Sequence, residues 1–357
     1  MKSLTLGIET SCDECSVSVV ERLESHANPL PTWRVKSLST HSQIKVHAEY
    51  GGVVPEIASR NHLESINLMI ESALNQAEVT WEEIESIAVT NRPGLVGALL
   101  VGVSAAKTIA FALKKPLIPV HHLEGHALSL FLDPSDKIQS LQFPLLLAVV
   151  SGGHTNLYFL EKPPLEWRKD ELSQSLIAHS LDDAAGEAFD KTAKILGFPY
   201  PGGKWIDEQA KLGNPNAFSL PRALPDKKIL NFSFSGLKTA VLNQARKLES
   251  SSTLNNHLAD LCASTQEAII DHLTQKIFLA YKKMNAKSLA IVGGVSANSR
   301  LRERLHEKSI PCYFPEMRYC TDNGAMIAAA GSLRFQQGYF LNGNPLLQLN
   351  AIAHPTE

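Results

Sequence analysis

The chain has 357 residues, of which 44% are hydrophobic, and its 34 basic and 36 acidic residues give a formal charge of -2. This length predicts two domains with a core each, and the near-neutral charge excludes a protein that binds nucleic acid through bulk charge. No apolar run approaches the roughly 20 residues of a membrane span, and no signal-peptide pattern is present. We therefore expect a cytoplasmic protein with no membrane partner.

The amino-terminal part alternates between strands and helices. Apolar alternation predicts strands at 4–8 and 17–19 around the turn E-T-S-C-D-E, and a third strand at 34–39. A long helix is expected from Pro55 to Ala77, with Leu63, Ile66, Ile70 and Leu74 on its buried face. A strand at 86–90, a helix at 96–113 and a strand at 117–120 complete the order β-β-β-α-β-α-β.

The same order recurs in the second half of the chain. The expected elements are strands at 145–150, 156–161, 175–179 and 288–292, and helices around 182–196, 236–247, 254–283, 296–308 and 322–337. The sequence thus predicts two copies of one α/β unit. We expect residues 1–115 with 322–340 in an amino-terminal lobe, 116–321 in a carboxy-terminal lobe with a helical insertion, and 341–357 as a tail.

Two histidines four residues apart, His122 and His126, stand in the segment V-H-H-L-E-G-H-A-L. On a helix they share one face and can hold one metal ion. Glu124 lies about 200° around the helix from either ring, so this is not the H-E-x-x-H motif of metalloproteases. Packing or capping without a metal is the alternative for such a pair on its own.

Glycine-rich turns follow several predicted strands. If the two units face each other, E-T-S-C-D-E at 9–14 and S-G-G-H-T at 151–155 lie on opposite walls of a cleft and offer amides to a phosphate. The segments Y-P-G-G at 200–203 and G-G-V-S-A-N at 293–298 fit the same interpretation. Taken singly, each is explained by ordinary turn geometry.

Four polar residues extend this hypothesis. Asp190 and Asp207 are candidates to hold ribose hydroxyls, and Asn298 to position a base or a sugar. Asp322 precedes a small-residue helix, where it either caps that helix or supplies a third metal ligand. Surface or capping roles are the alternative for each.

Two other patterns leave alternatives open. Cys12 and Cys15 have C-x-x-C spacing, but no second such motif accompanies them, and five cysteines do not make a disulfide framework. Basic segments at 222–238 and 299–308 are candidate RNA contacts, although a solvated helix face explains most such runs.

Together, these motifs resemble the universal family of tRNA adenosine threonylcarbamoyltransferases over nearly the whole chain. They are G-I-E-T-S-C-D-E at 7–14, Y-G-G-V-V-P-E-I-A-S-R-N-H at 50–62, P-G-L-V-G-A-L-L-V-G at 93–102, H-L-E-G-H at 122–126, V-S-G-G-H-T at 150–155, D-D-A-A-G-E-A-F-D-K at 182–191, Y-P-G-G at 200–203, N-F-S-F-S-G-L-K-T-A at 231–240, G-G-V-S-A-N at 293–298 and Y-C-T-D-N-G-A-M-I-A at 319–328.

The resemblance implies an α/β fold of the actin-like and sugar-kinase superfamily, with two ribonuclease-H-like lobes around a central cleft. It implies transfer of threonylcarbamoyl from threonylcarbamoyl-AMP to the exocyclic amine of the adenosine 3′ of the anticodon, in tRNAs reading codons that begin with A. It also implies accessory proteins, in bacterial relatives an inactive paralogue and a small ATPase.

The resemblance further implies site residues. His122, His126 and Asp322 match the ligands of one divalent metal per subunit, Fe2+ ahead of Zn2+. The positions that match contacts to the adenylate substrate, and to ATP if it binds, are Val149, Val150, Ser151, Gly152, Gly153, Asp190, Gly203, Asp207 and Asn298. We assign Glu14 a catalytic position near the reacting group, because it lies on the first phosphate-facing turn.

This chain departs from the family pattern at two positions. Cys15 stands where the family usually has threonine, and Arg92 where it has glycine, which makes Arg92 an added cation for tRNA or a partner. Two other functions remain as alternatives on the same fold: a small-molecule kinase and a non-catalytic ATP-binding scaffold.

Overall fold

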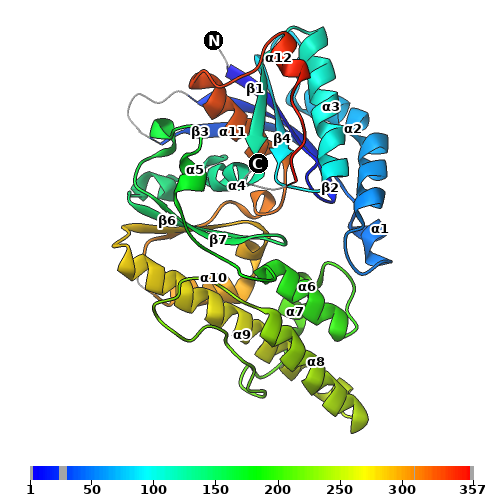
Figure 1. The fold of residues 1–357 in the computed structure, drawn as a ribbon, viewed down its shortest axis with the longest axis vertical. Helices are drawn as coiled ribbons and strands as arrows, with labels where there is room; N and C mark the ends of the chain where they lie inside the picture. Colours follow the sequence, from blue (N-terminus) through cyan, green and yellow to red (C-terminus); the bar gives the residue numbers. More distant parts are fainter. Residues whose placement is uncertain (1–2, 24–29, 309, 354–357) are drawn as a thin grey trace.

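The computed structural model describes residues 3–23, 30–308 and 310–353, and contains two five-stranded mixed sheets stacked with helices between and outside them (Figure 1). The predicted duplication is confirmed by the strand order. The first sheet runs β3-β2-β1-β4-β5 and the second β8-β7-β6-β9-β10, and in both the first three strands of the unit are antiparallel and the last two parallel.

The first sheet is covered on its outer face by two long helices. Its strands are β1 (Ser3–Glu9), β2 (Glu14–Leu23), β3 (Thr32–Ser42), β4 (Ser86–Arg92) and β5 (Leu117–His121). The short helix α1 (Ile44–Ala48) precedes α2 (Pro55–Ala77), and α3 (Val96–Ala112) follows β4. Pro55 stands in the first turn of α2, where its missing N–H costs nothing. Apolar side chains of β1 and β2 pack against both long helices.

The second sheet carries a larger helical layer on its outer face. Its strands are β6 (Leu145–Val150), β7 (Thr155–Leu160), β8 (Leu176–His179), β9 (Ser288–Val292) and β10 (Cys312–Tyr313). The covering helices are α6 (Ala185–Ile195), α7 (Gly202–Ala210), α8 (Ser235–Ser250), α9 (Leu254–Lys283) and α10 (Ser299–His306). Short elements are α5 (Glu171–Gln174), α12 (Asn344–Leu347) and 3-10 turns at Ser129–Phe131, Asp136–Ser140, Pro164–Glu166, Gly294–Ala297 and Met317–Tyr319.

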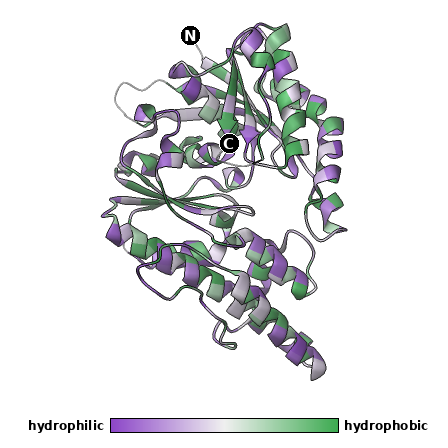
Figure 2. Cartoon of the chain, in the orientation of Figure 1, coloured by the Kyte–Doolittle hydropathy of each residue, from purple (hydrophilic) through white to green (hydrophobic). Residues whose placement is uncertain are grey.

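Two helices, α4 (His122–Leu128) and α11 (Gly324–Gln336), fill the layer between the sheets. Alternate residues of β6 serve two cores: Leu147 and Val149 face this middle layer, whereas Leu146 and Ala148 face the outer helices. Hydrophobic residues accordingly dominate the strands and α11, while the free end of α8 is hydrophilic (Figure 2). The described residues therefore form five layers, namely outer helices, sheet, middle helices, sheet and outer helices, with three hydrophobic cores between them.

Most predicted elements are present with ends shifted by a few residues, and the differences have physical reasons. Leu63 was expected on the buried face of α2 but is 64% exposed, because the helix turns Ile66, Ile70 and Leu74 toward the sheet instead. The short elements α1, β10 and α12, and α7 behind Y-P-G-G, were not expected. The lobe boundary after residue 115 falls just before β5, which pairs with β4 in the first sheet. None of the described helices is long and apolar enough to cross a membrane.

The basic run at 299–308 is largely engaged within the fold. Arg300 donates two hydrogen bonds to the Glu267 carboxylate on α9, at 2.7 and 3.0 Å, and Arg304 pairs with Asp271. This bidentate pair lowers the pKa of Glu267, chiefly through its hydrogen bond to Arg300. The two helices α9 and α10 are thus joined by charge-assisted bonds.

We expect Glu267→Gln to lower the free energy of unfolding by about 2 kcal/mol at neutral pH, since the substitution removes the carboxylate charge that faces Arg300. A carboxylate with a lowered folded pKa stabilises above its unfolded pKa, near 4.5, and loses this contribution as pH falls through the folded value. The difference between the two proteins, measured by urea unfolding, should therefore shrink below about pH 4.5.

Glu303→Gln is the matched control, because Glu303 pairs with the same Arg300 but is 65% exposed. Its expected effect is within about 0.5 kcal/mol. Equal losses for the two variants, or a Glu267 effect that does not depend on pH, would contradict the prediction.

Candidate metal centre

The two histidines project from the first turns of α4, directly after β5. His121 caps this helix, its Nδ1 accepting from the Leu123 N–H at 3.2 Å. His122 and His126 then share one face, with ring centroids 4.7 Å apart. Glu124 lies on the other side of α4 and pairs with Arg334 at 2.7 Å. The predicted helical placement of these three residues is confirmed.

Asp322 comes to the same point from the far end of the chain. Its Oδ1 lies 3.1 Å from Nε2 of His126 and 3.5 Å from Nε2 of His122. The capping alternative is wrong, because Asn323 is the N-cap of α11 and accepts from the Met326 N–H. The Asp322 carboxylate is therefore left to the histidines.

These three side chains fit one divalent metal ion. Their ligand atoms all lie within 4.8 Å of one another. His126 is fully buried, and its Nε2 lies 3.1 Å from the Asp322 carboxylate without the alignment of a regular hydrogen bond, so a metal ion bound between the two groups would satisfy both. Two imidazoles and a carboxylate are ligands that suit iron(II) or zinc, with positions left for a substrate oxygen.

Glu9 contacts the ring nitrogen of His122 that faces away from the proposed metal position. It is fully buried at the end of β1, and its Oε2 lies 3.0 Å from Nδ1 of His122 and accepts from the Thr90 hydroxyl at 2.7 Å. Its Oε1 accepts from the Ser11 N–H. A carboxylate on Nδ1 fixes the tautomer and leaves Nε2 for a metal. The sequence interpretation missed Glu9, although a carboxylate in a buried strand position is a visible signal.

Charge and burial shape the titration of this cluster. Burial opposes the charged form of His122, but Asp322 and Glu9 outweigh it and raise its pKa to about 9. Burial also opposes ionisation of Asp322, yet the two histidines hold its pKa well below the ordinary value. His154, whose ring centroid is 6.3 Å from that of His122, has its pKa lowered to about 3 by burial and both histidines. These shifts favour a positively charged His122 beside a negatively charged Asp322.

We expect Glu9→Gln to weaken metal binding by about tenfold or more, since the variant keeps the shape of Glu9 but removes the charge that supports His122. Competition with a chromophoric chelator measures this directly. Glu21→Gln, on the neighbouring strand and paired with the exposed Arg34, is the control. Equal metal affinity for Glu9→Gln and wild type would contradict the role given to Glu9.

The first turn, Glu9 to Glu14, meets this centre. The Ser11 hydroxyl lies 3.2 Å from Nδ1 of His122. Glu14, the predicted catalytic residue, starts β2, and burial together with the charges of Asp13 and Asp322 raises its pKa well above the ordinary range. Cys12 and Cys15 are free thiols with raised pKa values, caused first by burial, which is opposite to a reactive redox pair.

The second turn, at 151–154, follows β6. Its ends are tied by the Ser151 N–H, which donates to the His154 carbonyl at 2.8 Å, and by the His154 N–H, which donates to the Ser151 hydroxyl. Gly152 and Gly153 are exposed, with open space where a side chain would stand. Val149 and Val150 are fully buried at the end of β6, and their contact with a ligand stays a prediction. The ring of His154 brings this turn to the metal centre.

Asp190 and the Y-P-G-G segment form one unit. The Asp190 carboxylate accepts from the N–H of Gly202, the first residue of α7, at 2.7 Å and also from the N–H of Gly203. Burial is the main reason that its pKa rises to about 6. The Tyr200 hydroxyl donates to Asp13 at 3.2 Å, which joins this loop to the first turn.

Asp207 and Asn298 lie together at a neighbouring contact. The Asn298 amide donates to Gln266 at 2.9 Å and lies 3.4 Å from Asp207, while its oxygen caps α10. The Ser299 hydroxyl also donates to Asp207 at 2.8 Å. Both predicted nucleotide contacts are thus engaged in structural hydrogen bonds, and their role toward a ligand stays a prediction.

Comparison with known proteins agrees with this arrangement. A family model described as tRNA N6-adenosine threonylcarbamoyltransferase (TsaD) matches residues 34–329. A protein of that name from Variovorax paradoxus (strain S110) is 47% identical, covering 94% of this chain and 91% of its own. Another from Bacillus subtilis (strain 168) is 44% identical, with coverage of 97% and 96%.

Among solved structures, full-length HypF in its phosphate- and nucleotide-bound form superposes with a TM-score of 0.53 and 13% identity, over 94% of this chain and 46% of HypF. This likeness concerns the fold alone. The sequence relationship goes further, because it extends over nearly the full length of both partners. The chain therefore belongs to the family of tRNA N6-adenosine threonylcarbamoyltransferases.

Proposed function

We propose that this protein is a transferase that completes threonylcarbamoyladenosine in tRNA, moving threonylcarbamoyl from threonylcarbamoyl-AMP to the exocyclic amine of the adenosine 3′ of the anticodon. The observation that carries the proposal is the convergence of His122, His126 and Asp322 in a chain of this family. The kinase and scaffold alternatives are not favoured, because the similarity spans nearly the full length of named transferases.

We assign one divalent metal to His122, His126 and Asp322, Fe2+ before Zn2+. When bound, such an ion supplies Lewis-acid stabilisation of the negative charge that develops as the adenylate leaves. Glu9 keeps His122 oriented for this role. The carboxylate of Asp322 is 22% exposed, which supports access by a substrate to this side of the centre.

The turns on either side of the centre bind and orient the adenylate in this proposal. The amides of Gly152 and Gly153 donate no backbone hydrogen bond within the described residues, and we assign them to the phosphate oxygens, as in glycine-rich nests that need no lysine. Asp190, Gly203, Asp207 and Asn298 serve the nucleoside portion, and ATP would use the same contacts.

Transfer to an aromatic amine needs an activated electrophile more than a strong base. We therefore place Glu14 beside the reacting group and do not assign it the role of a strong base. The proposed role predicts reduced modification by Glu14→Ala with normal metal content. Unchanged modification by this variant would remove Glu14 from the mechanism.

We propose a cytoplasmic location, where tRNA is modified. We also propose two lobes joined by α11, with the first lobe extended through β5.

Of the basic segments, 222–238 is the better candidate for tRNA, because Lys227 and Lys228 are exposed whereas the arginines of 299–308 are paired internally. Exposed apolar side chains on the outer helices, such as Leu100 and Phe111 on α3, support docking of accessory proteins, namely an inactive paralogue and a small ATPase.

A reconstituted reaction tests the function. Purified protein, its accessory proteins, threonylcarbamoyl-AMP and unmodified tRNA should yield the modified nucleoside by mass spectrometry, and metal analysis of the same sample identifies the ion. Absence of product in the complete mixture, with transfer of the ATP γ-phosphate to a small molecule, would favour the kinase instead.

A further inference from the structure

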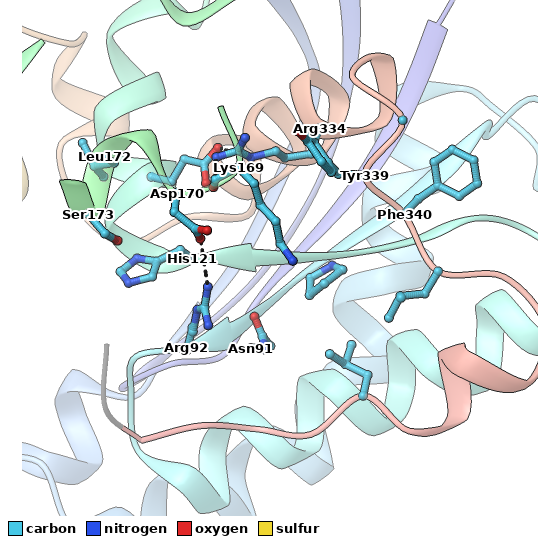
Figure 3. Close-up of a pocket in the computed structure, with 15 residues that line it drawn as sticks. Asn91, Arg92, His121, Lys169, Asp170, Leu172, Ser173, Arg334, Tyr339 and Phe340 are labelled. Carbon is cyan, nitrogen blue, oxygen red and sulfur yellow. Dashed lines mark hydrogen bonds and ion pairs between the residues drawn. The ribbon is translucent and has the colours of Figure 1, made fainter. Parts of the chain in front are cut away.

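A cavity of about 320 Å3 lies beside α4, and the residues that line it are drawn in Figure 3. Glu124 lines it, whereas His122 and His126 on the opposite face of the same helix do not. Its walls come from the ends of β4 and β5, from α5 and from the segment after α11. The volume is at the lower end of the roughly 300–1,000 Å3 that small-molecule sites occupy.

The charges around this cavity do not balance. Arg334 is paired with Glu124 at 2.7 Å, and Arg92 lies 3.9 Å from Asp170. Lys169 is exposed, forms no ion pair with any carboxylate of the described residues, and directs its ammonium group into the cavity in Figure 3. Three cations therefore face two carboxylates, which leaves one positive charge at Lys169.

The remaining wall is apolar. Tyr339 and Phe340 are 41% and 39% exposed, unusual for large aromatic side chains, and both line the cavity beside Leu341 and Leu349. Figure 3 shows both aromatic side chains among the residues that line the cavity with Lys169. An apolar wall with a few converging polar groups is the composition of small-molecule sites.

We propose that this cavity is a binding site for a small organic monoanion with an apolar body. Its acid group pairs with Lys169 beside Arg92, and its body lies against Tyr339 and Phe340. A dianion such as a phosphate monoester fits less well, because the other two cations already have carboxylate partners. The site is separate from the adenylate turns, which lie on the other side of α4.

Two fluorescent probes of matched shape test the proposal. The aromatic sulfonate 8-anilinonaphthalene-1-sulfonate should bind with one site per chain, and Lys169→Met should weaken it about two- to fivefold, as expected for one exposed ion pair. The neutral analogue N-phenyl-1-naphthylamine, which lacks the sulfonate, should bind both proteins equally. Ser173→Trp on the exposed rim of the cavity should weaken both probes.

Lys282→Met is the control, since it removes an equally exposed charge at the end of α9, away from the cavity. It should leave both probes unaffected, and benzoate should displace the sulfonate more strongly than benzamide does. Equal sulfonate affinity for wild type and Lys169→Met overturns the proposal, as does binding that Ser173→Trp leaves unchanged. Lys169, Ser173 and Lys282 are all exposed, so circular dichroism of the three variants should show wild-type folding.

Discussion

Replacing His126 with alanine is expected to remove more than about a hundredfold of the affinity for the divalent metal, and to reduce tRNA modification in parallel. His126 is fully buried, and its Nε2 lies 3.1 Å from the carboxylate of Asp322. The variant leaves only His122 and Asp322, and two ligands hold a metal weakly. Equilibrium dialysis followed by elemental analysis measures the bound metal.

His41→Ala is the matched control, because His41 is an exposed histidine on β3 whose sheet pairing uses only the backbone. It should keep wild-type metal content and activity. If His126→Ala bound metal like wild type, the assignment of the centre would be wrong, whatever its activity. If it lost metal but modified tRNA at the normal rate, the centre would be structural and the proposed chemistry would fail.

The separate parts of this centre were not equally visible in the sequence. The four-residue spacing of His122 and His126 predicts their shared face from helix geometry alone. Asp322 is about 200 residues away, and only the return of α11 to the first sheet brings it there. Its assignment as a ligand came from the family resemblance, since the sequence around Asp322 on its own favoured a helix cap.

The fold was predictable where local pattern and burial agree. Alternation predicted β1 and β2, continuous apolar runs predicted β4, β6 and β9, and the repeated order of elements predicted the two lobes. Leu63 shows the limit, because helical spacing permits a wider apolar stripe than the sheet buries. The helix α7 was missed for a different reason: Gly202 and Gly203 disfavour a helix locally, and it is the Asp190 carboxylate that satisfies their N–H groups.

The close contact between α11 and the first sheet leads to the second large prediction. Gly7→Ala should lower the free energy of unfolding by about 3 kcal/mol. A Cβ at Gly7 would collide with the Gly324 carbonyl oxygen and the Ala328 backbone nitrogen, and would lie 2.7 Å from the Ala328 side chain. Backbone atoms of a helix cannot move aside singly, so α11 as a whole must shift. Urea unfolding measures the loss.

Because Asp322 stands just before α11, the same shift should also weaken metal binding by the molecules that remain folded, which separates this variant from one that is merely less stable. Gly236→Ala is the control: Gly236 lies in the first turn of α8 with open space around its Cβ position, so alanine should leave stability unchanged or raise it by up to about 1 kcal/mol. Wild-type stability of Gly7→Ala would show that α11 does not need this close approach, and the packing that positions the third metal ligand would then require another explanation.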